Sequence, residues 1–170
     1  MLFRTSAIMI AVALNSLFCF GQEKNNVDVF IGKAADTAIL SASPDQIVFC
    51  FAGVCLLKEK SKSKTTLILV QDKIVTSEIK TCRIEYTTGL NERWTFSYFE
   101  TVLFVDEKTK IDHIVKLIEK NLGKKTEKTT EKQRTLFNWD FEKRYYLLLE
   151  ETSKNKDEIR LEIARNNGYD

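Results

Sequence analysis

The feature that most constrains the fold is an amphipathic segment at residues 109–123, TKIDHIVKLIEKNLG. With Ile111 taken as zero and about 100° per residue, four further aliphatic side chains fall within roughly 60° of it and form one stripe, and the charged side chains lie on the other side. Thr109 can cap the start, and Gly123 can adopt the left-handed conformation that ends a helix. The segment therefore predicts a helix over residues 110–122 that packs on one face of a sheet. The stripe consists of Ile111, Ile114, Val115, Ile118 and Leu122.

Most of the remaining chain is predicted to be extended. Apolar and polar residues alternate with a period of two, which is typical of half-buried strands. In one strand, Trp94, Phe96 and Tyr98 alternate with Thr95 and Ser97, so these aromatic side chains are predicted to share one face. The predicted strands of this kind cover residues 79–87, 93–105, 136–142, 144–150 and 158–165.

The first third of the chain has weaker signals. Residues 27–31, 37–42 and 66–70 are interpreted as short strands. A continuous apolar run at 47–57 follows the turn signal of Pro44 and favours a buried strand, although its periodicity also allows a helix. No internal repeat is found. The expected fold class is α+β, with a mostly antiparallel sheet and one main amphipathic helix at 110–122.

The first 21 residues have the pattern of a secretory signal peptide. Arg4 precedes an apolar core of about 14 residues, which is shorter than the roughly 20 that a membrane span needs. A lipid anchor on Cys19 fits poorly because Ser16 and Phe18 stand where such signals carry a leucine and a small residue. We therefore expect cleavage after Gly21, export to the periplasm or the medium, a flexible lead-in at 22–26, and a single domain over 27–170.

Net charge does not indicate an electrostatically recruited partner. The full chain carries +2, and removal of Arg4 with the signal leaves +1. The basic runs at 58–64 and 124–134 are interleaved with Ser, Thr and Glu, and they are interpreted as solvated connectors. Because they also lack aromatic residues, no nucleic-acid partner is expected.

The cysteines allow one disulfide at most. Without Cys19, the exported chain keeps Cys50, Cys55 and Cys82, an odd number for an oxidising compartment. Cys50 could pair with Cys55 only if Gly53 makes a turn, and otherwise Cys82 could pair with Cys50 or with Cys55. The alternative to a disulfide is three buried thiols. The only histidine, His113, points about 160° away from the start of the helix stripe. No metal site and no cofactor are predicted, since paired Cys or His ligands at metal-binding spacing are absent.

The sequence contains none of the catalytic motifs that we searched for. The chain has no G-x-S-x-G elbow, phosphate-binding loop or H-E-x-x-H motif. Carboxylates on the predicted strands could still act as acid and base. Asp140 and Glu142 share one strand face and are interpreted as solvated. The other candidates are Glu85, Glu100, Glu150 and Glu151.

Aromatic residues suggest a binding surface. Trp139, Tyr145 and Tyr146 lie on the last predicted strands, where an exposed position would let them contact a protein, peptide or glycan partner. We therefore expect a non-catalytic binding or interaction module. The alternatives are a cofactor-independent enzyme that uses carboxylates and a structural, envelope-associated component.

Substitution of the helix stripe tests the packing of residues 110–122. We expect Ile114→Asp or Ile118→Asp to prevent folding, because either places a carboxylate where an aliphatic side chain should be buried. Circular dichroism during thermal unfolding is the measurement. A soluble variant that melts cooperatively would contradict a helix packed on a sheet.

Overall fold

The structure is a computed structural model that describes residues 26–51, 53–74, 77–88, 92–104, 111–124, 126–142, 144–152 and 154–166. The predicted signal peptide, its cleavage site and Cys19 lie outside the described residues, as does Thr109. The helical elements are α2 (Asn26–Ala34), the 3-10 helix η1 (Thr37–Leu40), α3 (Pro44–Phe51) and α4 (Ile111–Leu122). The strands are β1 (Cys55–Lys62), β2 (Thr66–Ile74), β3 (Ile79–Thr88), β4 (Trp94–Phe104), β5 (Glu127–Glu131), β6 (Arg134–Asp140), β7 (Tyr145–Thr152) and β8 (Asn155–Arg165).

The strands form one antiparallel sheet in the order β1-β2-β3-β4-β8-β7-β6-β5. The chain makes one meander from β1 to β4 and a second from β5 to β8, and the two meanders join where β4 pairs with β8. Helical segments precede each meander, α2 to α3 the first and α4 the second. The topology therefore twice places helical segments before four strands, although the sequence shows no corresponding repeat.

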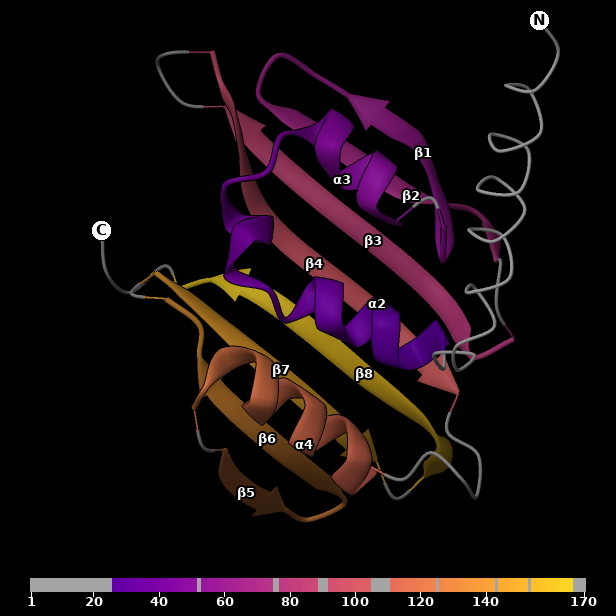
Figure 1. Ribbon diagram of the computed structural model, residues 1–170, viewed down its shortest axis with the longest axis vertical. Helices are drawn as coiled ribbons and strands as arrows, with labels where there is room; N and C mark the ends of the chain where they lie inside the picture. The colour runs from indigo at the N-terminus through magenta and orange to yellow at the C-terminus, as the bar shows by residue number, and fades with distance from the viewer. Residues whose placement is uncertain are drawn as a thin grey trace, which may run out of the picture.

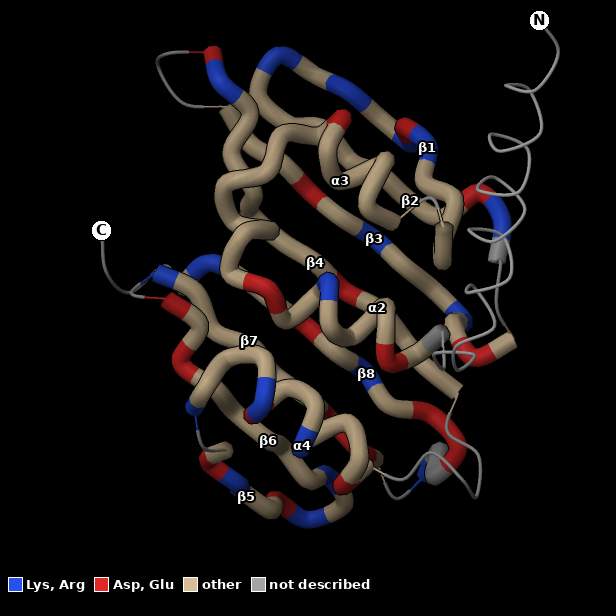
Figure 2. Tube along the Cα trace, in the orientation of Figure 1, with Lys and Arg blue, Asp and Glu red and all other residues tan. Residues whose placement is uncertain are grey.

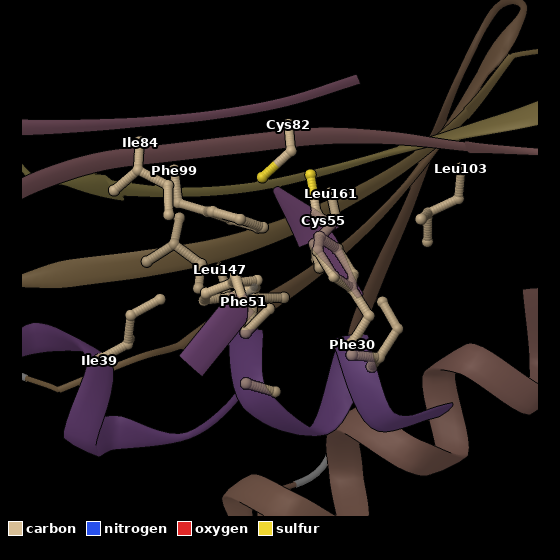
Figure 3. Packing of buried hydrophobic residues seen from close by; sticks show 14 of the residues in the cluster. Phe30, Ile39, Phe51, Cys55, Cys82, Ile84, Phe99, Leu103, Leu147 and Leu161 are labelled. Atoms are coloured by element: carbon tan, nitrogen blue, oxygen red, sulfur yellow. The ribbon is translucent and has the colours of Figure 1, made fainter. Parts of the chain in front are cut away.

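The helices lie together on one face of the sheet (Figure 1). α2 lies between its neighbours and contacts both α4 and α3. Beneath them, the aromatic rings of Phe30 in α2, Phe51 in α3 and Phe99 in β4 pack with centroids 5.2–6.0 Å apart, and Figure 3 shows this part of the core. Burying one such side chain contributes about 1.5–3 kcal/mol. This layer of apolar side chains is the core of the protein.

The expected α+β fold with one main helix is wrong, because the sheet dominates and three short α-helices share its cover. At about 4.8 Å per strand, eight strands are about 34 Å wide, whereas one helix is about 10 Å across. A single helix therefore cannot cover this sheet. Among the described residues, no helix is long and apolar enough to cross a membrane.

The helix predicted at 110–122 is observed as α4, with Ile114 and Ile118 fully buried. It ends as expected at Gly123, whose φ is 64° and whose N–H donates to the carbonyl oxygen of Glu119 at 2.8 Å. His113 is half exposed, and its Nε2 lies 2.9 Å from Oδ1 of Asp28 in α2. The polar side of α4 thus contacts α2 as well as solvent.

The strand predicted at 47–57 is also wrong, since the run divides into α3 and the start of β1. The signal for a helix is a capping box. The Ser43 N–H donates to Oε1 of Gln46 at 2.8 Å, and the Gln46 N–H donates to Oγ of Ser43 at 3.4 Å. Pro44 occupies the first helical position, where its missing N–H is harmless. Ile47 and Phe51, one turn apart, are then buried.

The short strands predicted at 27–31 and 37–42 are helical instead. Val27, Phe30, Ile31 and Ala34 are completely buried with the spacing of a helix face. η1 begins after Asp36, whose carboxylate accepts a hydrogen bond from the Ala38 N–H at 2.9 Å. Because residues 27–31 alone cover little more than one turn, their apolar positions matched a strand as well as a helix.

The basic runs interpreted as connectors form the two edges of the sheet. Most of 58–64 belongs to β1, and 127–131 is β5, whose side chains are all exposed. Lys and Glu on an edge strand oppose pairing with another chain, because such pairing would bury their charges. Strand signals were missed here because an edge strand exposed on both faces has no apolar alternation.

The left-handed conformation of Gly123 predicts a cost for a side chain there. We expect Gly123→Ala to lower the free energy of unfolding by about 1 kcal/mol, because an L-residue at positive φ is strained. A Cβ at Gly123 would contact nothing within 4 Å, so the loss would come from the backbone alone. Urea denaturation measures the difference.

Gly53→Ala is the matched control. A Cβ there also meets nothing within 4 Å, and Gly53 does not have positive φ. We expect this variant to be unchanged or stabilised by up to about 1 kcal/mol. Equal losses in both variants would contradict the assigned backbone conformation.

Candidate functional site

The sheet face opposite the helices, here called the open face, carries a connected group of charged and aromatic side chains. Strand residues point alternately to the two faces, and the positions between the buried ones lie on the open face. Figure 2 shows acidic and basic positions on the central strands β3, β4 and β8. We call the connected group the open-face cluster; it consists of Tyr98, Glu100, Arg134, Tyr146, Glu150, Arg160 and Glu162.

The strand register creates an electrostatic conflict at the centre of this cluster. Glu100 of β4 is directly opposite Glu162 of β8, and like charges in such a pair are destabilising. Arg160, two residues along β8, resolves the conflict. Its Nε lies 3.3 Å from Oε1 of Glu100, and its Nη2 lies 2.9 Å from Oε2 of Glu162.

A third carboxylate is shared between two arginines. Arg134 of β6 donates from Nε and Nη2 to the two oxygens of Glu150 at 2.7 and 2.8 Å, a bidentate pair. Nη1 of Arg160 lies 4.0 Å from Oε2 of the same carboxylate. Glu150 is 7% exposed and Glu162 is 9% exposed. Such buried carboxylates require these partners, because an uncompensated charge there would be costly.

Two tyrosines complete the cluster by donating to carboxylates. The Tyr98 hydroxyl donates to Oε2 of Glu100 at 2.7 Å, and the Tyr146 hydroxyl donates to Oε1 of Glu162 at 2.8 Å. Burial, and then the hydrogen bond to Glu162, raises the pKa of Tyr146 to about 12. Burial and the Glu100 hydrogen bond also raise the pKa of Tyr98. Both hydroxyls therefore stay protonated and remain donors at neutral pH.

Both tyrosines flank the same small residue. Tyr98 and Tyr146 are each paired in the sheet with Ala164 of β8, one from either side. Aliphatic side chains also lie on the open face. On a fully solvated sheet face, polar residues would be expected at these positions. These aliphatic side chains are half-buried: Ile68, Val70, Val102, Leu136 and Leu148.

The face of Tyr98 differs from the sequence prediction. Trp94, Phe96 and Tyr98 were expected on one face, but the pairing of β3 with β4 runs from Glu85↔Tyr98 to Tyr86↔Phe96 and leaves Ser97 without an opposite residue. This bulge turns Tyr98 to the open face, whereas Phe96 and Phe99 both face the core.

The predicted contact residues are placed in three different environments. Trp139 is 2% exposed and belongs to the core beneath the helices. Tyr145 packs partly against the core, and its hydroxyl donates to the carbonyl oxygen of Phe96 at 2.8 Å. Tyr146 lies on the open face within the cluster. Only Tyr146 of the three is therefore placed with Glu100 and Glu150, which sequence analysis named as carboxylate candidates.

The remaining carboxylate candidates lie apart from Arg160. Glu85 pairs with Arg83 on the open face, and Asp140 and Glu142 are exposed. Glu151 is half-buried on β7. The sequence pattern did not distinguish Arg134, Arg160 and Glu162 from other polar strand residues. Their polar positions on alternating strands were visible, but which strands lie beside one another was not.

The arrangement suits binding better than acid–base chemistry. Three carboxylates face two guanidinium groups and two hydroxyl donors, so each carboxylate already has a partner. Four cavities that we located in the described part of the chain lie at the β5–β6 turn, at the start of α3 and beside η1. Arg134 lines two of them, whereas Arg160 and its three glutamates line none. In the same residues, no group of three or more His, Cys, Asp or Glu side chains could hold a metal ion.

Comparisons with known proteins give no relative. No protein-family model matches the chain, and no curated protein or solved structure matches it.

The role of Arg160 can be tested by removing its charge. We expect Arg160→Met to lower the free energy of unfolding at neutral pH by about 1–3 kcal/mol, because Glu100 and Glu162 would repel each other without it. The expected loss is below that of a fully buried pair, since Arg160 is 39% exposed. Urea denaturation monitored by fluorescence measures it.

Lys80→Met is the matched control, because Lys80 forms an exposed pair with Glu158 at 2.6 Å on the same sheet. Exposed pairs contribute about 0–1 kcal/mol. If the two variants lost the same small amount, Arg160 would not be the centre of the cluster.

Proposed function

We propose that this protein is an exported, non-catalytic binding module that binds a protein partner on the open face of its sheet. The observation that carries the proposal is the composition of that face. Tyr98, Tyr146 and Arg160 stand among half-buried aliphatic side chains. Tyrosine and arginine are enriched at protein interfaces relative to the rest of the protein surface.

Prior ordering of the side chains supports binding. Each tyrosine hydroxyl and each carboxylate of the open-face cluster already has a hydrogen-bond or ion-pair partner. A partner would therefore not need to immobilise them, and immobilising such a side chain costs about 0.5–1.5 kcal/mol. The rings of Tyr98 and Tyr146 would provide contact area at little further entropic cost.

The size of the face fits a protein better than a small ligand. Eight strands at about 4.8 Å spacing, with strands about 20 Å long, give a face of about 700 Å². Each partner in a standard protein interface buries roughly 800 Å². We therefore favour a protein surface over a compact ligand.

The net charge of the open-face cluster indicates which side chains the partner would carry. Within the open-face cluster, three carboxylates exceed two guanidinium groups by one negative charge. A complementary partner would combine aliphatic side chains with at least one Lys or Arg that adds to the carboxylate network. Export of the module is supported by the signal pattern of residues 1–21 and by Gly21 before Gln22.

The test compares capture by two charge variants. We expect Leu148→Lys, which places a lysine beside Glu162 on the open face, to weaken binding of the partner by about 10-fold or more. The protein is purified from the periplasm or medium of its host, where mass spectrometry should find Gln22 as the first residue. Proteins captured from the same compartment are identified, purified and titrated by calorimetry.

Phe49→Lys is the matched control. Phe49 lies on α3, on the helix side of the sheet, and is 83% exposed, so the same charge is added away from the open face. We expect binding within about twofold of the unchanged protein. Loss of binding in Phe49→Lys with retention in Leu148→Lys would assign the partner to the helix side and overturn the proposal.

A further inference from the structure

Two cysteines that lie far apart in the sequence meet in the core. Cys55 is the first residue of β1 and Cys82 lies in β3. Figure 3 shows their sulfur atoms next to one another in the layer between the sheet and the helices. Both side chains are buried.

The strand arrangement explains how they meet although β2 lies between their strands. β1 begins directly after the turn that follows α3, where the Val54 N–H donates to the carbonyl oxygen of Phe51 at 2.9 Å. The pairing of β1 with β2 then slips in register between Leu56 and Leu57. The Cys55 sulfur lies 3.8 Å from Oε1 of Gln71 in β2. Cys55 thus belongs to the layer between sheet and helices, where Cys82 also points.

We propose that Cys55 and Cys82 form a disulfide when the protein meets an oxidising thiol–disulfide environment, and that this bond ties the edge strand β1 to β3. Cys50 is not the partner. It lies on α3 and is exposed, whereas the sulfur atoms of Cys82 and Cys55 lie next to each other in the core.

The electrostatics of the pair favour the exchange reaction. A hydrogen bond with the Cys82 thiol lowers the pKa of Cys55. The same hydrogen bond and burial raise the pKa of Cys82 well above its ordinary value. Cys55 is therefore the thiol that ionises first, and a thiolate is the nucleophile in disulfide exchange.

Formation of the Cys55–Cys82 bond consumes one external disulfide. The Cys55 thiolate attacks a sulfur of a disulfide-bearing oxidant, such as oxidised glutathione, and releases one thiolate from it. Cys82 then loses its proton and attacks the Cys55 sulfur in the mixed disulfide, which releases the second thiol. Two protein thiols are oxidised and one external disulfide is reduced to two thiols. Because both thiols are buried, the exchange occurs during folding or when the β1 edge opens.

Peptide mapping tests the pairing in the unsubstituted mature protein. It is refolded with reduced and oxidised glutathione, alkylated, digested without reduction and analysed by mass spectrometry. We expect one cross-linked peptide pair that joins Cys55 to Cys82, with Cys50 alkylated. Alkylation of all three cysteines, or a bond to Cys50, would overturn the proposal.

The thermal stability of the unsubstituted protein provides a second measurement, which remains informative even if a cysteine variant fails to fold. Reduction with dithiothreitol should lower the Tm of the oxidised protein by about 5–15 °C. The Cys50→Ser variant should show the same shift, whereas Cys82→Ala should show none. An unchanged Tm on reduction of the unsubstituted protein would also contradict the bond. The outcome is independent of the open-face partner, because no partner is present and the oxidant is added.

Discussion

The antiparallel pairing of β4 with β8 is the interaction on which the rest of the structure depends. Within the described residues it is the only strand pairing that joins the two meanders into one sheet. If it were absent, β4 and β8 would be edge strands with unpaired backbone groups. The same pairing brings Phe99 opposite Ile163 on the helix side. The cores of the two halves are therefore a single core.

The same ladder also creates the open face. By placing Glu100 opposite Glu162, it sets two carboxylates against each other, and a cation on the same face reduces their repulsion. Arg160 provides that cation from the next open-face position of β8. One register therefore decides both how the core closes and which side chains gather opposite it, so that a slip of one residue would exchange the two faces.

Local patterns predicted the elements whose signal is complete within a dozen residues. The amphipathic stripe of α4 and the alternation in β3, β4, β6, β7 and β8 were visible without any knowledge of neighbours. Other signals were present and misinterpreted. The capping box of Ser43 and Gln46 marked the start of α3, yet its apolar interior resembled a strand. When a short segment is buried on several sides, nearly all of its residues are apolar. Its sequence then shows neither the period of a helix nor that of a strand, so the two cannot be distinguished.

By itself, the sequence determined that the chain is rich in antiparallel strands, that a helix predicted over 110–122 ends at Gly123, and that the last strands of the chain carry aromatic and acidic side chains. Only the tertiary structure decided where those side chains meet. Arg160 contacts the Tyr98 hydroxyl at 3.3 Å from 62 residues away, after a bulge at Ser97 has turned Tyr98 to the open face. The physical reason is that periodicity is a property of adjacent residues, whereas strand order, register and bulges are chosen by which distant segments bury one another's apolar surface.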